Sequence, residues 1–455
     1  MVKRLFFLKS AFQRFRYAAI FSVCWTISAC LVEICDPILN HFSGACVEFV
    51  PYFDLLAKTF TLGIPMFITF QLVSEKYNFN FPKVLMLIFG GICLFLYFLD
   101  GFIFDKSVVD NVYFQQQFYL YFLILSLFLS FASFFKTSMH SFWKFNNILF
   151  IKLIQIIFWC FIYIVIYFFC IYIIDFLLVQ DLSFSIYKLG MIIIFGYVGS
   201  LYFLTQIPTN LDSLEEHTPY PKFYYYISSL YFLPASILFI AFSYSFFGAM
   251  LFLGWSFNII ITIFTLLGVG FGLFFLIQME LLRTRTSNKV TLFFLKYFYW
   301  FILPVVVVNL VFLSQEWLMN GVVEFWYVCW LLLLWVVIVC LYFIFSKFKD
   351  IRLIPMSLFI LSIIIATDPF MPFNVACKSQ LFLLEKTLEE DNILQNGKIS
   401  FETTLTISEL NESKVKNIIT YLDEHNRLRL LKKLYPYTIA SESLTTRRLY
   451  YDFNL

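Results

Sequence analysis

Residues 325–345 read FWYVCWLLLLWVVIVCLYFIF and contain no charged side chain. A helix of about 20 residues, rising 1.5 Å per residue, is long enough to cross the ~30 Å hydrocarbon layer of a membrane. Backbone polar groups find no water in that layer, so they must be satisfied within a helix or a closed barrel. The run is too long for a barrel strand of ~10 residues and lacks alternation of period two. We therefore predict a membrane-spanning helix.

The same pattern recurs along the chain and predicts an all-α, polytopic transmembrane bundle of about eleven spans. Composition agrees, because 61% of the residues are hydrophobic and only 13% are charged, whereas a soluble protein has about a quarter charged. A lipid bilayer is therefore the expected surrounding. The predicted spans are 17–35, 55–73, 83–104, 113–135, 148–174, 187–206, 225–250, 256–279, 292–314, 323–346 and 352–370.

The lysines and arginines between these spans fall mainly on one side of the predicted membrane. The N-terminus and the loops on its side hold 18 of them, the opposite loops hold 3, and the remaining 11 lie after the last span. Short cytoplasmic loops are enriched in basic residues. We therefore expect a multi-pass membrane protein with a cytoplasmic N-terminus and, after an odd number of spans, an extracytoplasmic C-terminus.

The chain becomes polar after residue 371, which predicts two domains: a transmembrane bundle (1–371) and a small extracytoplasmic α(+β) domain (372–455). Leu381, Leu384 and Leu388 form one helical stripe. A second helix is indicated by the spacing of an apolar set and by Thr406 and Glu409, which have the spacing of a capping box. That apolar set consists of Val415, Ile418, Ile419 and Leu422. Asn396-Gly397 predicts a turn between the two helices.

Carboxylates gather around the first predicted outside loop. Glu33 and Asp36 lie where the first span ends, and Glu48 and Asp54 lie across the loop. Paired carboxylates at a membrane rim could act as acid and base in the transfer of a lipid-linked group, or bind a cation. Ordinary interfacial charge explains the same pattern, so these four residues are weak catalytic candidates.

A second polar cluster occupies the loop before the tenth span. Aromatic residues there are expected as an interfacial belt, so a binding site competes with a simple interfacial role. The binding candidates are Glu316, Asn320, Glu324 and Tyr327. Gly268, Gly270 and Gly272 in the eighth span are expected to permit close helix packing.

The remaining residue patterns indicate neither a metal site nor a cofactor. The ten cysteines include no Cys-x-x-Cys pair and no Cys/His cluster, and no phosphate-binding glycine loop, nucleophile elbow or nucleic-acid motif is present. Cys35 and Cys46 flank the first outside loop and could form a disulfide in an oxidising compartment; whether they pair is left open. No nucleic-acid partner is expected.

Short landmark segments follow one another in order along nearly the whole chain. They are Arg14-Phe15, 62–65 (LGIP), 142–146 (FWKFN), 220–222 (YPK), Pro234, Trp255, Pro304, Gly321 with Glu324 and Tyr327, 354–358 (IPMSL), 368–370 (DPF) and Ser379-Gln380. In order and spacing the chain resembles the bacterial multipass membrane family called domain of unknown function 4153. Trp326 stands where that family has an arginine. The resemblance implies a bacterial inner-membrane protein and no particular reaction.

Three functions are compatible with these observations. The leading hypothesis is a non-enzymatic or transport-related envelope protein whose C-terminal domain contacts an envelope protein. A membrane enzyme that acts on a lipid-linked substrate at the outer face is the first alternative, because of the carboxylates around the first outside loop. A scaffold or assembly factor is the second.

Overall fold

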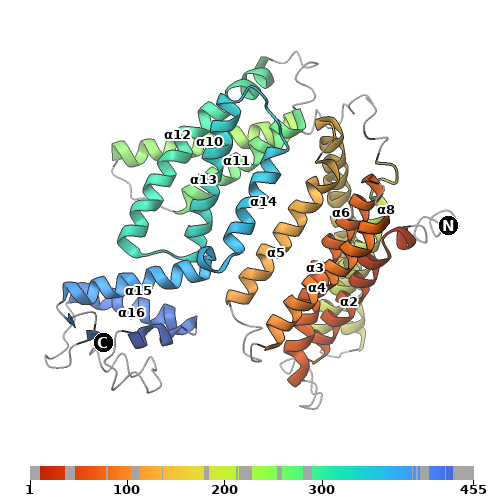
Figure 1. Cartoon of the computed structure of the whole chain (residues 1–455), viewed down its shortest axis with the longest axis horizontal. Helices are drawn as coiled ribbons and strands as arrows, with labels where there is room; N and C mark the ends of the chain where they lie inside the picture. Colours follow the sequence, from red (N-terminus) through yellow and green to blue (C-terminus); the bar gives the residue numbers. More distant parts are fainter. Residues whose placement is uncertain are drawn as a thin grey trace. The chain divides into compact units, whose positions relative to one another are not determined.

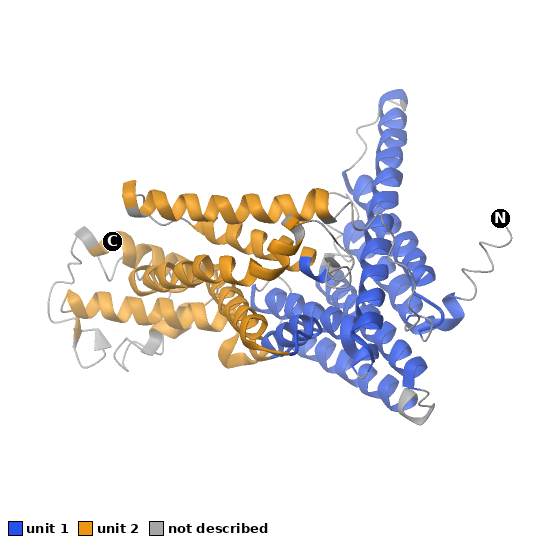
Figure 2. Cartoon of the chain, turned by 90° about the horizontal axis from the view of Figure 1, so that it is seen from above, with its two compact units in different colours: residues 1–226, 276–286, 348–363 blue, residues 227–275, 287–347, 364–455 orange. Residues whose placement is uncertain are grey.

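The computed structural model consists of α-helices joined by short connections (Figure 1). It describes residues 11–35, 47–77, 80–103, 112–135, 137–178, 184–211, 214, 228–253, 259–279, 289–391, 393–395, 398–399, 409–425 and 427–433. These residues form two compact units, which Figure 2 distinguishes by colour.

The first unit comprises residues 1–226, 276–286 and 348–363. Within it α3 packs against α2, α4 and α5, and α2 also packs against α7 and α8. Its helices are α2 (Arg16–Cys35), α3 (Val50–Tyr77), α4 (Asn80–Ile103), α5 (Val112–Phe131), α6 (Met139–Leu178), α7 (Phe184–Ile192), α8 (Ser200–Gln206) and most of α14 (Leu353–Ala366). Short helical turns are η1 (Val47–Phe49), η3 (Ala132–Phe134) and the π-helix η4 (Ile193–Gly199).

The second unit comprises residues 227–275, 287–347 and 364–455. In it α12 packs against α10 and α13, while α15 packs against α13 and α16. Its elements are η6 (Ser228–Phe232), α10 (Leu233–Leu253), most of α11 (Ile259–Met279), α12 (Lys289–Asn320), α13 (Glu324–Phe345), η8 (Asp368–Phe370), α15 (Pro372–Glu390), β1 (Leu394–Gln395), β2 (Lys398–Ile399), α16 (Glu409–Glu424) and η9 (Leu428–Lys433).

Hydrophobic side chains cover the outside of these helices. Phe161 is 62% exposed, Phe176 73% and Phe252 87%. So large an exposed apolar surface is unfavourable in water. It is compatible with a lipid surrounding, whose hydrocarbon chains are themselves apolar. In the described residues, ten helical segments are long and apolar enough to cross a membrane. The chain is therefore a multi-pass helical membrane protein.

The eleventh predicted span is shorter than expected. Residues 352–370 do not form one helix, because α14 ends at Ala366 and a 3₁₀ turn, η8, follows. The α-helix ends before Thr367, whose backbone is extended. Pro369 has no N–H with which to continue the α-helical hydrogen bonds, and Pro372 begins the next helix. The 14 residues of α14 span only about 21 Å at 1.5 Å per residue, less than the ~30 Å of a hydrocarbon layer.

The sixth predicted span, 187–206, is one continuous helical segment with a π-helical centre. Gly196 lies in this centre, and a Cβ there would come within 2.0 Å of the Trp25 ring of α2. The backbone of α2 can therefore approach closely, and the Ser22 hydroxyl donates to the Gly196 carbonyl at 2.8 Å. The wider π-turn and the missing side chain together make room for α2.

Both helices predicted for the polar tail are present. Val415, Ile418, Ile419 and Leu422 are all buried on α16, as their spacing predicted, and Leu384 and Leu388 are buried on α15. The strands pair Leu394 with Ile399 on either side of 396–397; the predicted turn at Asn396-Gly397 and the capping residue Thr406 lie outside the described residues.

The tail belongs to the same compact unit as α10–α13. Its described β-structure is limited to strands of two residues. The described part of the tail is therefore almost entirely helical, with less β-structure than the predicted α(+β) class implies. A separate domain boundary at residue 372 stays a prediction.

Candidate functional site

The connection between α12 and α13 is held by the first helix of the tail. Gly321 adopts φ +74°, a left-handed conformation that glycine takes without strain, and its N–H donates to the carbonyl of Trp317 at 3.1 Å. The next N–H, of Val322, donates to the Ser379 hydroxyl at 2.9 Å. The Gln380 amide in turn donates to the carbonyl of Val322 at 3.2 Å. Side chains of α15 thus take up backbone groups that α12 and α13 leave free.

A second set of contacts joins the start of α13 to α16. The Tyr421 hydroxyl donates to Glu324 Oε1 at 2.7 Å, and Nε2 of His425 lies 3.2 Å from the same oxygen. The side chains of His425 and Glu324 are each only 14% exposed, so water screens this ion pair weakly. Nδ1 of His425 lies 2.7 Å from the Tyr421 carbonyl oxygen.

The geometry indicates which ring nitrogen of His425 always carries a proton. A carbonyl oxygen only accepts, so Nδ1 must carry a proton and donate it to Tyr421. A neutral imidazole would then turn the lone pair of Nε2 toward the Glu324 carboxylate, whereas an imidazolium presents a second N–H. The hydrogen bond to Glu324 accordingly raises the pKa of His425 above its ordinary value, although burial acts in the opposite direction.

The neighbours of His425 hold it in place without offering a nucleophile. Its ring centroid lies 4.1 Å from that of Tyr421 and 5.7 Å from that of Phe373, over which Arg427 stacks at 4.9 Å. Burial raises the pKa of the adjacent Cys377 thiol to about 11, so the thiol is protonated and unreactive near neutral pH. Burial and the bond to Glu324 also raise the pKa of Tyr421, so its hydroxyl stays a donor.

The four predicted binding residues are divided between two environments. Asn320 donates to Glu316 at 2.9 Å on an exposed surface at the end of α12. Tyr327 is buried, with its ring centroid 6.0 Å from that of Trp317. Glu324 alone enters the contact with α16. Sequence reasoning missed His425 and Tyr421 as its partners, because residues so far apart along the chain give no local signal.

The four predicted catalytic carboxylates do not form one described cluster. Glu33 pairs with Lys188 at 3.2 Å and Asp54 with Lys58 at 2.7 Å. Glu48 is exposed in η1, and Asp36 lies outside the described residues. Cys35 is disulfide-bonded; Cys46, the partner suggested by the sequence, lies outside them as well.

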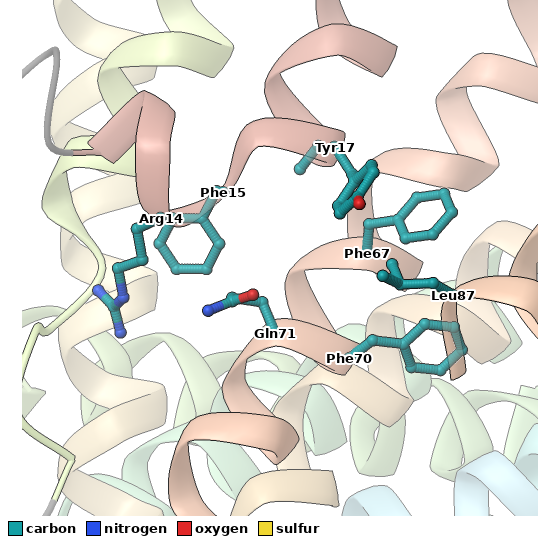
Figure 3. A pocket seen from close by; sticks show the side chains of 8 residues that line it. Arg14, Phe15, Tyr17, Phe67, Phe70, Gln71 and Leu87 are labelled. Atoms are coloured by element: carbon teal, nitrogen blue, oxygen red, sulfur yellow. The ribbon is translucent and has the colours of Figure 1, made fainter. Parts of the chain in front are cut away.

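Two arginine clusters in the first unit were also not foreseen from the sequence. Arg14 donates to both oxygens of Glu75, at 2.9 and 2.6 Å, and to the carbonyls of Ile207 and Pro208. Figure 3 shows Arg14 beside a cavity of about 10 Å³, into which Gln71 also points. This volume is close to the minimum that holds one water molecule.

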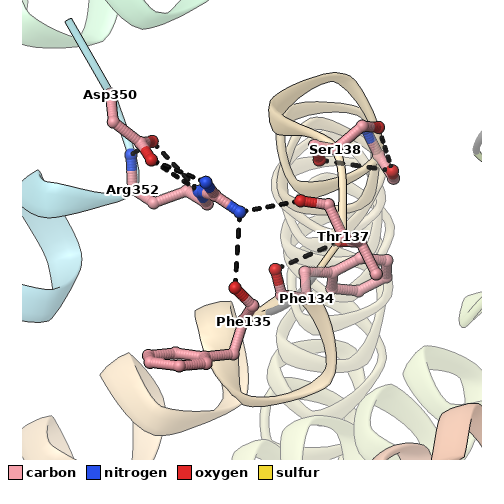
Figure 4. Close-up of polar contacts among 7 residues, drawn as sticks. Phe134, Phe135, Thr137, Ser138, Asp350 and Arg352 are labelled. Atoms are coloured by element: carbon pink, nitrogen blue, oxygen red, sulfur yellow. Dashed lines mark hydrogen bonds and ion pairs between the residues drawn. The ribbon is translucent and has the colours of Figure 1, made fainter. Parts of the chain in front are cut away.

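The second arginine cluster links the start of α14 to the turn after α5 (Figure 4). Arg352 donates to both carboxylate oxygens of Asp350, at 2.9 and 2.6 Å, and to the Thr137 carbonyl at 2.7 Å. Burial alone would raise the pKa of Asp350, but the bonds from Arg352 outweigh it and hold that pKa below its ordinary value. The pair therefore stays charged at neutral pH and serves as a structural tie.

A buried polar network joins three spans of the second unit. The Asn309 amide of α12 donates to Thr265 at 2.9 Å and accepts from Thr262 at 3.1 Å, both on α11. Thr265 also bonds Ser243 of α10 at 3.0 Å. Hydrogen bonds of this kind hold membrane helices together, so the network explains polar residues in otherwise apolar runs without a ligand.

The glycines of α11 confirm the packing prediction in part. A Cβ at Gly272 would come within 2.2 Å of the Phe298 ring, and one at Gly268 within 3.0 Å of Phe239. Gly270 has open space around it. Two of the three predicted positions therefore permit close packing.

Among the described residues, no group of three or more His, Cys, Asp and Glu side chains is arranged to share a metal ion. Comparison with family models, curated proteins and solved structures finds no match to this chain. Its function is therefore argued from its own residues.

Proposed function

We propose that this protein is a multi-pass inner-membrane protein without catalytic activity that carries α15 and α16 as an extracytoplasmic platform for an envelope protein. One observation carries the proposal: Ser379, Gln380 and His425 bind the connection between α12 and α13. The tail is thereby packed against the membrane helices, and its position does not depend on a linker alone.

The same contacts support the sidedness of the platform in this proposal. Residues 322 and 379 touch, so the chain between them must cross the membrane an even number of times. α13 is long enough to cross once, and α14 must then make the return. The distribution of basic residues favours the outer side for the α12–α13 connection, and in this proposal the tail lies on the same side. The disulfide at Cys35 supports an oxidising compartment at the end of α2.

The partner surface in this proposal is the polar face of α16. Its apolar face is buried, whereas Glu412, Ser413, Lys416 and Asn417 are exposed. Charged and polar residues of this kind are costly to insert into lipid, whereas they are usual in the polar rim of a contact between two proteins.

Photo-crosslinking in intact cells tests the platform. A crosslinking residue at position 413 or 417 should give one discrete protein adduct, while the lipid-exposed position 238, 69% exposed on α10, should give none. Adducts that are absent from both tail positions, or equal at all three, would overturn the proposal. Charge reversal at Lys416 should weaken the adduct at 413 without lowering the amount of protein in the membrane.

An enzyme acting on a lipid-linked substrate remains the second candidate, because Asp54 lines a cavity of about 410 Å³. Its test is the double substitution Glu33→Ala and Asp36→Ala. Loss of the cellular phenotype at normal protein levels, with the tail adduct intact, would favour the enzyme over the platform.

Membership in the family called domain of unknown function 4153 is a further proposal. It rests on the order of the landmark segments. Its support is that the landmark Ser379-Gln380 contacts the two residues that flank the landmark Gly321: the Val322 N–H donates to Ser379, and the Gln380 amide donates to the Asn320 carbonyl.

A further inference from the structure

Phe382 is a large apolar side chain on the exposed side of the polar tail. It belongs to α15 and is 68% exposed. Lys378 and Lys386, four residues before and after it, are exposed as well. Residues four apart lie on one face of a helix. The three side chains therefore form one surface, which we call the Phe382 stripe.

The Phe382 stripe lies opposite the packed face of α15. That face consists of Phe373, Cys377, Leu384 and Leu388, which are all buried, and α15 packs against α13 and α16. Packing of the tail therefore does not require an aromatic ring at position 382. A single exposed apolar residue is common on a soluble protein, so the meaning of Phe382 depends on where α15 lies relative to the membrane.

The charges of α12 mark the boundary of the membrane near α15. Residues 297–315 contain no charged side chain, and Lys296 and Glu316 stand at the two ends of this stretch. The stretch rises about 28 Å at 1.5 Å per residue, which matches the ~30 Å thickness of a hydrocarbon layer. Glu316 therefore lies where the hydrocarbon layer ends and the head groups begin.

α15 lies at the level of the head groups. The Val322 N–H donates to the Ser379 hydroxyl of α15 at 2.9 Å, and the Gln380 amide donates to the Val322 carbonyl at 3.2 Å. Val322 follows α12 and lies at most ~9 Å beyond Glu316 along the helix axis, while the head-group layer is about 5–7 Å deep on each side. α15 crosses the ends of α12 and α13 in Figure 1, so it runs along this layer.

Exposed apolar side chains of the spans reach the same level. Leu318 in the last turn of α12 is 80% exposed, and Phe325 in the first turn of α13 is 53% exposed. Such side chains face lipid in a protein that spans a membrane, because exposure to water is unfavourable for them. The lipid-facing surface of the spans therefore continues up to the connection that α15 binds.

We propose that the Phe382 stripe binds the surface of the bilayer in which the protein is embedded. The Phe382 ring enters the boundary between head groups and acyl chains, where aromatic side chains of interfacial helices lie. The ammonium groups of Lys378 and Lys386 bind lipid phosphates on either side of the ring. α15 is thus an interfacial helix with one face on α13 and α16 and the other on lipid.

The two lysines suit phosphate in both reach and charge. A lysine side chain lays its apolar stem along an apolar surface and extends its ammonium to the polar layer, where three N–H donors are available. Lys386 lies 4.0 Å from Glu390, and both side chains are more than half exposed, so this ion pair contributes little and leaves the ammonium accessible. Phosphate is common to all phospholipids, so the contact requires no particular head group.

Photo-crosslinking of the purified full chain in nanodiscs of phosphatidylcholine and phosphatidylglycerol tests the inference. The photoreactive residue p-benzoylphenylalanine at position 382 keeps an aromatic ring there. After irradiation, the intact mass should rise by the mass of one lipid. Position 238 of α10, which is 69% exposed on a span, is the positive control. Position 417, exposed on α16, is the negative control and should give at least tenfold less lipid adduct than position 382.

The lysines are tested with the crosslinker kept at position 382. Lys378→Gln and Lys386→Gln should each lower the yield of lipid adduct several-fold, because each removes an attraction to phosphate near the membrane surface. Lys414→Gln is the matched control: Lys414 is exposed on α16, and its loss should leave the yield unchanged. Since all three lysines are exposed, the melting temperatures of the variants should equal that of the parent.

Two results would overturn the inference. One is a lipid adduct at position 382 no larger than at position 417, or a yield that stays the same when both Lys378 and Lys386 are replaced. The other is a discrete protein adduct at position 382 in intact cells, which would assign the stripe to a protein partner. The lipid contact is expected on whichever side of the membrane the tail lies. Its failure is therefore distinct from failure of the platform, which is measured as protein adducts at positions 413 and 417.

Discussion

The Glu324 carboxylate and the His425 imidazole lie 3.2 Å apart, Oε1 to Nε2, in a place where little water reaches them. Glu324 begins α13, a membrane-spanning helix, and His425 directly follows α16 of the tail. The pair therefore joins the tail directly to the start of a membrane-spanning helix. Because histidine changes charge near neutral pH, it also makes the attachment of the tail sensitive to pH.

We expect the tail to be held more firmly in mild acid than in mild base. The pKa of His425 is raised in the folded protein, so its stabilising contribution is complete below the ordinary histidine pKa of about 6.5 and is lost as pH rises through the raised value. Hydrogen exchange of α16 measured across this range should show protection falling with pH. The other charged groups beside it are Glu424, which precedes it in the chain, and Arg427, which stacks over Phe373.

His425→Gln should remove this pH dependence, because an amide keeps one donor but does not titrate. At pH 6 the variant should lose about 1–2 kcal/mol of tail stability, the scale of a hydrogen bond between charged groups. A pH profile that is the same in the variant and the parent would refute the role of His425.

Gly321→Ala should loosen the same attachment from the other side. Its φ of +74° costs a residue with a side chain about 1–2 kcal/mol, and the added Cβ would come within 2.8 Å of the Gln380 amide. We expect a lower melting temperature in detergent and faster proteolysis of α15. Gly248→Ala in α10 is the control: a Cβ there meets nothing within 4 Å, so its stability should be unchanged or slightly higher.

The spans were predictable from sequence and the contacts between them were not. A run such as 325–345 indicates a membrane-spanning helix by its length and lack of charge. The buried faces of α15 and α16 are indicated by the helical spacing of their apolar residues. The end of α14 was misjudged, because residues up to 370 are apolar enough for a span while Pro369 interrupts the helix. The partners of Arg14, Asn309 and Glu324 lie in elements far away in the sequence, so no local sequence pattern predicts these contacts.

Loss of the polar network should weaken the packing of the second unit. Asn309→Ala removes two side-chain hydrogen bonds to α11, and bonds between membrane helices contribute about 0.6 kcal/mol on average and up to about 1.7. We expect about 1–2 kcal/mol of destabilisation in thermal unfolding. Ser243→Ala should destabilise the protein less than Asn309→Ala does. Ser245→Ala should leave the stability unchanged, since its exposed hydroxyl donates to the Ala241 carbonyl of its own helix.

Arg14 should contribute far more to the stability of the first unit than Arg16, which lies two residues further along the chain. Arg14→Ala leaves the partly buried Glu75 without its cation and two carbonyls without a donor, which should destabilise the first unit by about 2–3 kcal/mol. Arg16 makes an exposed bond to Tyr17, so Arg16→Ala should lose less than about 0.5 kcal/mol. Melting temperatures of the two variants in the same detergent provide the comparison.

Whether the short helix α14 crosses the membrane is decided by which residues lie on the same side. Val322 contacts Ser379 and Gln380, so we expect the α12–α13 connection and the tail on one side of the membrane and the connection 346–352 on the other. With Met319→Cys, Lys386→Cys and Lys349→Cys, all at exposed positions, a membrane-impermeant maleimide added to intact cells should label the first two above the parent chain and not the third. The 14 residues of α14 then cross a locally thinned layer, at a cost of a fraction of a kcal/mol per Å of mismatch. Labelling of position 349 together with 386 would mean that α14 does not cross, and the extracytoplasmic platform would have to be abandoned.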